Sequence, residues 1–217
     1  MDSGIDSAKL QPGLDHIVYA TPDLEGSARD VAAALGVAPS FGGSHIGRGT
    51  RNSLLSLGNG SYLELIGLDP AQENLAGEIP FGLDRLTAPK IVAWALRVHD
   101  IEQFVERVKA AGYEPGPVAG MGRITPDGTQ IQWRLTRSLG DDVPALIPFL
   151  IDWEDSLHPS ETAAAGARLG DFHVETADPT GVKHVLAILG AEVRVEVAPM
   201  SRLAARLSGP KGELDIC

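Results

Sequence analysis

A histidine and a glutamate lie inside two short apolar segments that are typical of core strands. His16 is part of Leu-Asp-His-Ile-Val-Tyr-Ala, residues 14–20, and Glu64 is part of Tyr-Leu-Glu-Leu-Ile, residues 62–66. A buried glutamate is costly unless its carboxylate is paired or binds a metal. Two interpretations stay open: a hydrogen bond between core strands, or an imidazole and a carboxylate that coordinate a divalent metal.

We expect His16 and Glu64 to be the catalytic residues if the protein is an enzyme. If Glu64 is not a metal ligand, it is the candidate general base. The apolar strands around it then predict a raised pKa for its carboxyl group, because burial disfavours the charged form.

Further polar side chains lie in a glycine-rich stretch, residues 41–52, between these two segments. Its glycines permit close backbone approach, but no Lys-Ser/Thr pair and no helix start follows, which excludes a phosphate-binding loop. His45, Arg51 and Asn52 are the hydrogen-bond donors that we expect to bind substrate. Arginine suits a carboxylate or an enolate, whereas Arg48 in the same stretch is more typical of a solvated surface residue.

The three tryptophans all lie between residues 91 and 153, although aromatic residues make up only 5% of the chain. We expect Trp94, Trp153 and Arg123 to face a cleft and bind substrate, and His158 to lie at its mouth. The alternative is that the tryptophans fill the core and that His158 is an ordinary loop residue.

A three-fold repeat supplies the elements that must position these residues. A short apolar strand that runs into an amphipathic helix begins at residues 14, 91 and 170, which are 77 and 79 residues apart. Each helix begins after an aspartate and ends near a glycine, Gly36, Gly112 or Gly190, as capping preferences predict. Three short strand patterns separated by turn residues follow each helix.

The repeat predicts three βαβββ units and two connectors. We call residues 13–68 unit one, 90–154 unit two and 169–217 unit three; residues 1–12 are a tail, and 69–89 and 155–168 are connectors. Such a unit is too small to bury both faces of its sheet alone. We therefore expect an α+β fold in which βαβββ modules pair into a curved mixed sheet around a cleft, with the helices outside.

Unit three repeats the histidine on its first strand, at His173. Alignment of the last strands of units one and three places Asp215 at the position of Glu64. Unit three is thus a candidate to complete a site with unit one.

Composition excludes several classes of function. The 217 residues carry a net charge of −11, which argues against a nucleic-acid partner, and the single cysteine excludes internal disulfides and cysteine-based zinc sites. No apolar run approaches membrane-spanning length, and residues 1–12 lack the pattern of a signal peptide. We expect a cytoplasmic protein with a small-molecule ligand and no membrane partner; a homodimer is compatible with the sequence.

Several phrases of the chain resemble the vicinal oxygen chelate superfamily (glyoxalase, bleomycin resistance and extradiol dioxygenase proteins), in particular its glyoxalase-like subgroup. They lie between Leu14 and Pro159: Leu-Asp-His-Ile-Val, Gly-Arg-Gly-Thr-Arg-Asn, Tyr-Leu-Glu-Leu, Thr-Pro-Asp-Gly, Pro-Phe-Leu-Ile-Asp-Trp and His-Pro. The resemblance implies paired βαβββ modules around one divalent metal (Zn, Fe, Mn or Ni), with His16 and Glu64 at two ligand positions.

Unit two departs from this pattern. Its counterparts of His16 and Glu64 are Ala93 and Phe149, so units one and two cannot supply the four ligands found in glyoxalase I from the same positions. Either His45 or His158 completes the site, or unit one pairs with unit three, or no metal binds.

The resemblance and the residues leave three hypotheses. The first is an enzyme of lyase, isomerase or dioxygenase type that acts on a small oxygenated metabolite. The second is a metal-free protein that binds a small molecule, as superfamily members that sequester antibiotics do, with tryptophans stacked on a planar ligand. The third is a scaffold for dimerisation.

Overall fold

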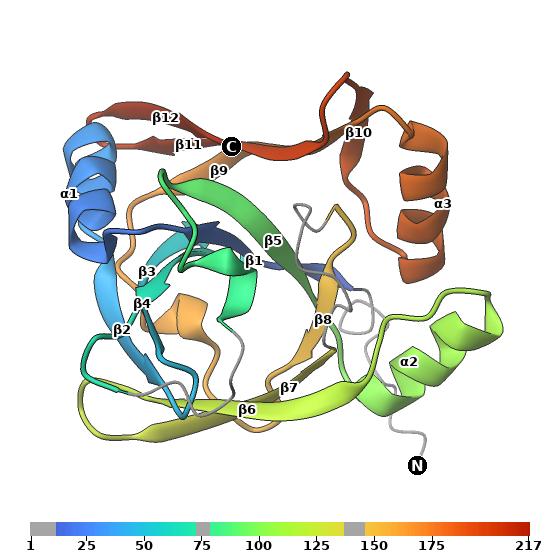
Figure 1. The fold of residues 1–217 in the computed structure, drawn as a ribbon, viewed down its shortest axis with the longest axis horizontal. Helices are drawn as coiled ribbons and strands as arrows, with labels where there is room; N and C mark the ends of the chain where they lie inside the picture. Colours follow the sequence, from blue (N-terminus) through green and yellow to red (C-terminus); the bar gives the residue numbers. More distant parts are fainter. Residues whose placement is uncertain (1–11, 73–78, 137–145) are drawn as a thin grey trace, which may run out of the picture.

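Units one and two together form a closed eight-stranded barrel in the computed structural model, which describes residues 12–72, 79–136 and 146–217. Unit one contains β1 (Gly13–Ala20), α1 (Leu24–Leu35), β2 (Ser40–His45), β3 (Thr50–Gly58) and β4 (Ser61–Leu68). Unit two contains β5 (Lys90–Arg97), α2 (Ile101–Ala110), β6 (Val118–Ile124), β7 (Gln130–Thr136) and β8 (Phe149–Asp152). The strands run around the barrel in the order β1-β4-β3-β2-β6-β7-β8-β5 (Figure 1).

Both units have the same strand order, in which the first strand of each unit pairs in parallel with its last. β1 pairs with β4, and β5 pairs with β8. The antiparallel pairs β1–β5 and β2–β6 join the two units into one barrel. This arrangement confirms the predicted curved sheet around a cleft. The partner of module one, which the sequence left open, is module two.

The helices of the two barrel units begin and end at the predicted signals. The side chain of Asp23 accepts a hydrogen bond from the backbone of Gly26 at the start of α1, and Gly36 ends the helix in the left-handed conformation. Asp100 caps the start of α2 in the same way through the backbone N–H of Gln103. Caps of this kind satisfy backbone groups that helix ends leave unpaired.

Unit three keeps the βαβββ element order but has a different topology. It contains β9 (Arg168–Thr176), α3 (Pro179–Leu189), β10 (Arg194–Val197), β11 (Arg202–Gly209) and β12 (Gly212–Ile216). Its sheet has the order β10-β9-β11-β12, so β11 separates the first strand from the last. The sequence alignment of Asp215 with Glu64 therefore does not hold in the structure, because Asp215 does not lie on a strand beside β9. Asp215 pairs with Arg206, and His173 contacts Asp171 and Glu175.

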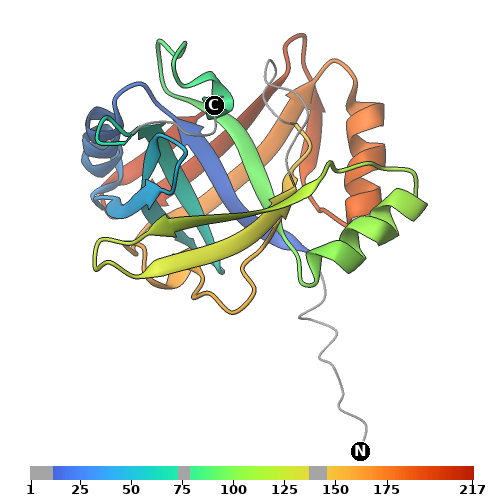
Figure 2. The same cartoon turned by 60° about the horizontal axis from the view of Figure 1, so that its bottom comes forward.

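The sheet of unit three packs against the outside of the barrel (Figure 2). One of its faces covers α1 and the outer side of β5 and β3, and α3 packs beside β10. A continuous apolar core fills this interface; it includes Ile17, Leu35, Trp94, Val174, Leu203 and Leu207. Unit three thus closes the outside of the barrel and does not contribute strands to its interior.

Among the described residues, two short 3-10 turns belong to the connectors. η2 (Pro80–Gly82) lies between β4 and β5, and η3 (Pro159–Glu161) lies between β8 and β9. The second connector also bridges to β3, where the backbone N–H of Ser56 donates to the carbonyl of Ala164. Within the described ranges, no helix is long and apolar enough to cross a membrane.

Candidate functional site

A β-bulge in β1 brings two neighbouring polar residues into one buried cluster. The register of β1 with β5 shifts between Leu14 and His16, so Asp15 has no partner on β5. The Oδ1 atom of Asp15 lies 2.6 Å from Nδ1 of His16. The imidazole of His16 stacks on the ring of Tyr62, with 4.7 Å between ring centroids. Its Nε2 edge remains directed at the barrel interior.

Asp15 is fully buried and receives further hydrogen bonds at its other oxygen. Nε2 of His158 lies 2.8 Å and Nε1 of Trp153 lies 3.1 Å from Oδ2. Burial raises the pKa of this carboxyl group, but the hydrogen bonds and charges of His158 and His16 outweigh it and hold the pKa well below its usual range. Asp15 is therefore a carboxylate at neutral pH.

The proton positions around Asp15 follow from its partners. Indole nitrogen only donates, so Trp153 donates to Oδ2. The Nδ1 atom of His158 accepts the backbone N–H of Ser160, so His158 also donates to Oδ2 through its Nε2 proton. On the other side the carboxylate accepts the Nδ1 proton of His16, so Nε2 is the ring nitrogen of His16 that faces the cavity.

Glu64 lies on β4 opposite Val18 of β1, one strand from His16. Its Oε1 accepts a 2.6 Å hydrogen bond from Nδ2 of Asn52 and lies 3.5 Å from Nε2 of His45, and its Oε2 lies 3.7 Å from Nε2 of His16. Burial raises the pKa of Glu64, but the hydrogen bonds from His45 and Asn52 and the charges of the two histidines lower it to about 2. The predicted rise in this pKa is wrong, because polar neighbours outweigh the apolar strands.

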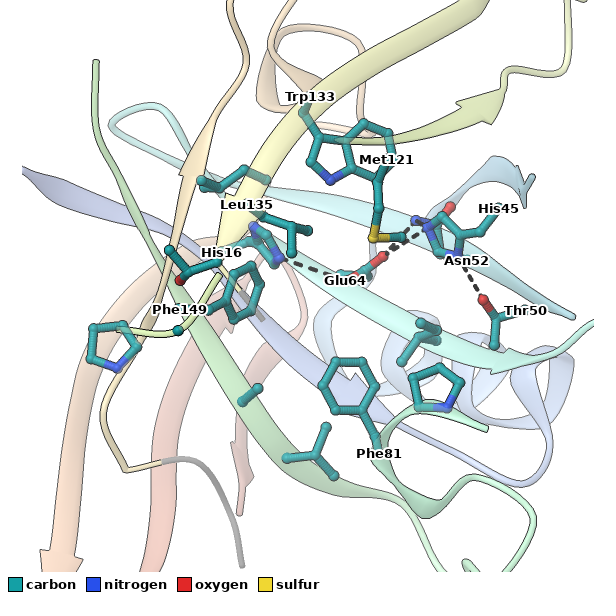
Figure 3. Close-up of a pocket in the computed structure, with 18 of the residues that line it drawn as sticks. His16, His45, Thr50, Asn52, Glu64, Phe81, Met121, Trp133, Leu135 and Phe149 are labelled. Carbon is teal, nitrogen blue, oxygen red and sulfur yellow. Dashed lines mark hydrogen bonds and ion pairs between the residues drawn. The ribbon is translucent and has the colours of Figure 1, made fainter. Parts of the chain in front are cut away.

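A chain of hydrogen bonds extends from Glu64 across β3 to β2 and β6. Arg123 donates to Oδ1 of Asn52 (3.3 Å), which fixes the amide so that its Nδ2 faces Glu64 and Nε2 of His45. The other ring nitrogen of His45 lies 2.9 Å from the hydroxyl of Thr50. Each polar group on this wall of the barrel thus orients the next one (Figure 3).

Because Gly42 has no side chain, the hydrogen-bonded side chains of Arg123 and Asn52 can lie against its backbone. A Cβ atom at Gly42 would lie 2.3 Å from both the Arg123 guanidinium and Oδ1 of Asn52. The close backbone approach that the glycine-rich stretch predicts is therefore an approach to protein side chains.

The barrel interior is a cavity of about 840 Å³. Six of the site residues that the sequence suggests line it: His16, His45, Asn52, Glu64, Arg123 and Trp153. Trp133, considered from the sequence only as one of the three tryptophans, also lines it. Sequence reasoning did not single out several other lining residues: Thr50, Tyr62, Phe81, Met121 and Leu135. Most of these are apolar or aromatic residues on alternating strands, where core packing is the default interpretation.

Three residues predicted to bind substrate do not line this cavity. Arg51 forms an ion pair with Glu25 on the outside of the barrel, at 2.7 Å. Trp94 faces the core between the barrel and unit three, where its ring packs edge-on against Phe172. His158 lies behind Asp15, as described above.

The side chains that could donate ligand atoms (the donor set) do not fit the bound divalent metal that the superfamily implies. Over residues 12–72, 79–136 and 146–217, no three His, Cys, Asp or Glu side chains are placed to hold a metal ion. Apolar residues, Ala93 and Phe149, stand at the counterparts of His16 and Glu64. The alternative ligands have other partners: Asn52 and Thr50 bind His45, and Asp15 and Ser160 bind His158.

Comparisons with known proteins agree with this fold. A family model described as a glyoxalase-like domain matches residues 14–190. A hypothetical protein from Staphylococcus aureus is 18% identical over 88% of each chain, with a TM-score of 0.66. Methylmalonyl-CoA epimerase from Mycobacterium tuberculosis is 21% identical over 69% of this chain and 91% of its own, with a TM-score of 0.43.

A variant of methylmalonyl-CoA epimerase from Streptomyces coelicolor is 18% identical over 66% of this chain and 96% of its own, with a TM-score of 0.42. At these identities, likeness to solved structures concerns the fold alone. No curated protein matches the sequence.

Proposed function

The chain belongs to the glyoxalase-like domain family, within the vicinal oxygen chelate superfamily, and on this premise we propose that it is an isomerase- or lyase-type enzyme that transfers a proton at a carbon next to a carbonyl group. One observation carries the proposal. His16 is held at Nδ1 by the buried carboxylate of Asp15 and directs Nε2 into the cavity, beside Glu64. A carboxylate that fixes the tautomer of an imidazole in this way is the arrangement of a general base.

In the proposed step, Nε2 of His16 takes a proton from the carbon next to the substrate carbonyl. The electrons of the broken C–H bond form a carbon–carbon double bond, and the carbonyl electron pair moves to oxygen to give an enolate. The buried Arg123 lines the same cavity and is a cation that can stabilise the enolate oxygen. Return of the proton to another position gives an isomer, whereas loss of a group from the neighbouring carbon gives a lyase product.

Glu64 has a supporting role in this proposal. Because its pKa is about 2, it stays ionised at neutral pH and does not donate a proton. The imidazolium that forms on His16 then lies between two carboxylates, Asp15 at Nδ1 and Glu64 at 3.7 Å from Nε2. Such a pair stabilises the positive charge at the moment when it develops.

The test is deuterium incorporation from D₂O into simple ketones at the carbon next to the carbonyl, followed by NMR. We expect exchange with the wild-type protein, and a His16→Gln variant that keeps its fold but loses exchange. His173→Gln is the matched control, since His173 lies on the outer sheet of unit three. Exchange that persists in His16→Gln contradicts the assignment of the base.

A binding protein without catalysis is the second candidate, and a specific feature favours it. The rings of Trp133 and Trp153 lie 5.0 Å apart, and both residues line the cavity, which suits a planar ligand. This candidate predicts ligand-dependent tryptophan fluorescence with no exchange or other change in the ligand. A dioxygenase is not favoured, because the donor set among the described residues does not complete a metal site.

A further inference from the structure

The described lining of the cavity contains five acidic or basic side chains, and they differ in burial. Lys90 and Glu114 are exposed to solvent, and Arg48 is half-buried. Glu64 and Arg123 are buried, with 8% and 3% of their surface exposed. Because solvent and salt screen an exposed charge, these two buried charges dominate the electrostatics of the cavity interior.

Arg123 reaches the barrel interior from β6. It stands opposite His45 of β2 in the antiparallel pair, so the two side chains share the inner face of the barrel. One guanidinium nitrogen donates to Oδ1 of Asn52 at 3.3 Å, and Asn52 is its one hydrogen-bond partner among the described residues. In this part of the chain no fully buried side-chain nitrogen lacks a partner, so the other N–H groups of Arg123 are open to the cavity.

The buried guanidinium lacks the ion pair that arginines on the outside have. Arg51 lies 2.7 Å from Glu25, and Arg206 lies 2.7 Å from Asp215. Over residues 12–72, 79–136 and 146–217, no carboxylate oxygen lies within 4 Å of the Arg123 guanidinium. A buried charge without a counter-ion is costly, although it lies at the end of the chain where it would be cheapest to leave neutral.

Asn52 keeps the buried cation apart from the buried anion. Its amide accepts from Arg123 through Oδ1 and donates to Oε1 of Glu64 through Nδ2 (Figure 3). Burial lowers the pKa of Arg123, and the nearby Tyr62 and Glu64 offset only a part of this effect. The charge of Arg123 is therefore incompletely compensated within the protein, and an anion in the cavity would complete the compensation.

The surroundings of Arg123 indicate which anion fits. A carboxylate is planar and singly charged, so it matches both the fork and the single charge of a guanidinium. A phosphate dianion would bring a second charge close to Glu64, with no second buried cation in the described lining. Much of the remaining lining is apolar and includes Leu54, Met121 and Trp133, and the volume of about 840 Å³ suits a drug-sized molecule.

We propose that the cavity binds a small molecule with one carboxylate group and an apolar remainder, and that the Arg123 guanidinium binds the carboxylate. This assignment goes beyond the proposed proton transfer, and it holds whether or not the ligand is turned over. Since the bond to Asn52 uses only one of the N–H groups, the guanidinium can bind a carboxylate and still donate to a carbonyl oxygen beside it.

The experiment compares two probes of nearly the same shape by isothermal titration calorimetry. The probes are 4-phenylbutyrate, a carboxylate, and 4-phenylbutanamide, its uncharged counterpart. We expect the wild-type protein to bind the carboxylate at least about tenfold more tightly than the amide. Arg123→Gln removes the charge and should abolish this preference. Arg123→Lys keeps the charge without the fork and should bind the carboxylate about tenfold more weakly than the wild type, which serves as the test if Arg123→Gln does not fold.

Arg51→Gln is the matched control, because Arg51 is an arginine on the outside that pairs with Glu25; its preference should equal that of the wild type. Arg48→Gln and Lys90→Gln test the other two cations of the lining, and each should keep most of the preference. Failure of the carboxylate to bind the wild type, or equal binding of the two probes, overturns the proposal. So does a preference that persists in a folded Arg123→Gln or Arg123→Lys variant at the level of the wild type.

Neither probe contains a ketone, so this measurement is separate from the D₂O exchange that tests the proposed function. A preference for the carboxylate without exchange on any ketone supports this inference and contradicts the proton transfer. Exchange on ketones without a preference for the carboxylate does the reverse.

Discussion

Replacement of Asp15 by asparagine should reverse the tautomer of His16. Two N–H donors, from His158 and Trp153, point at Oδ2 of Asp15, so the amide oxygen of an asparagine must take that position. The amide NH₂ group then faces Nδ1 of His16, which must accept instead of donate. The proton of His16 consequently moves to Nε2, where it points at Glu64. Because Nε2 then carries a proton, it can no longer act as a base.

The expected loss of stability is moderate. In the variant, the three hydrogen bonds that the Asp15 carboxylate accepts are replaced by hydrogen bonds with a neutral amide. A hydrogen bond to a charged partner contributes about 1 kcal/mol more to stability than one to a neutral partner. Part of this loss is offset, because a buried charge is removed and the Nε2 proton of His16 gains Glu64 as a partner. We expect the free energy of unfolding to fall by about 2 kcal/mol, and exchange activity to fall roughly 10⁴-fold.

NMR correlation of ring protons with ¹⁵N in the six histidines reports the tautomer directly. His16→Gln identifies the signals of His16 by their loss. We expect the proton on Nδ1 in the wild type and on Nε2 in Asp15→Asn, with urea unfolding measured on both.

Asp171→Asn is the matched control for stability. Asp171 also bonds to Nδ1 of a histidine, His173, but on a partly exposed sheet face, so its loss should change the free energy of unfolding by less than about 1 kcal/mol. A wild-type His16 with its proton on Nε2, or a variant that keeps the proton on Nδ1, would refute the reasoning.

Three further predictions concern the acid response and the packing of glycines. Because the pKa of Glu64 falls from 4.5 to about 2 on folding, Glu64 contributes stability above pH 4.5 that is lost as the pH falls towards 2. The unfolding free energy of the wild type should therefore drop by about 3 kcal/mol more than that of Glu64→Gln over this window, and equal drops contradict the lowered pKa of Glu64. Gly42→Ala should lower stability by about 1–3 kcal/mol and weaken ligand binding, whereas Gly120→Ala on β6, where a Cβ meets no atom within 4 Å, should be neutral by thermal unfolding. Gly209→Ala places a Cβ 2.4 Å from the carbonyl of Leu35 and should loosen unit three from α1, which limited proteolysis detects, while Gly212→Ala in the same hairpin should not.

The strands and helices of the barrel could be predicted because their signals are local. Alternating apolar residues, aspartate caps and terminal glycines each depend on a few neighbours in sequence, and α1 between Asp23 and Gly36 follows them. Glu64 and His16 were found for the same reason, since each is a polar residue in an apolar strand pattern.

Asp15 could not be found by that reasoning. Strict alternation places it on the face opposite His16, but the bulge in β1 removes it from the pairing with β5 and brings its carboxylate to the imidazole. The pKa of Glu64 was predicted in the wrong direction for a related reason. Its hydrogen-bond partner Asn52 lies on the neighbouring strand, 12 residues away, and the sequence does not show which side chains a register brings together.

Trp94 shows how unit three and the barrel depend on each other. Ala93 stands at the counterpart of His16 and faces the cavity, so alternation requires Trp94 beside it to face outward. A fully buried tryptophan on the outside of a barrel needs a cover, and Phe172 of β9 supplies it. Unit three presents its apolar face to the barrel and its charged face, with His173, to the other side. The element order that made unit three a candidate to complete a site with unit one therefore belongs to a cover, and the proposed chemistry stays with the β1–β4 pair inside the barrel.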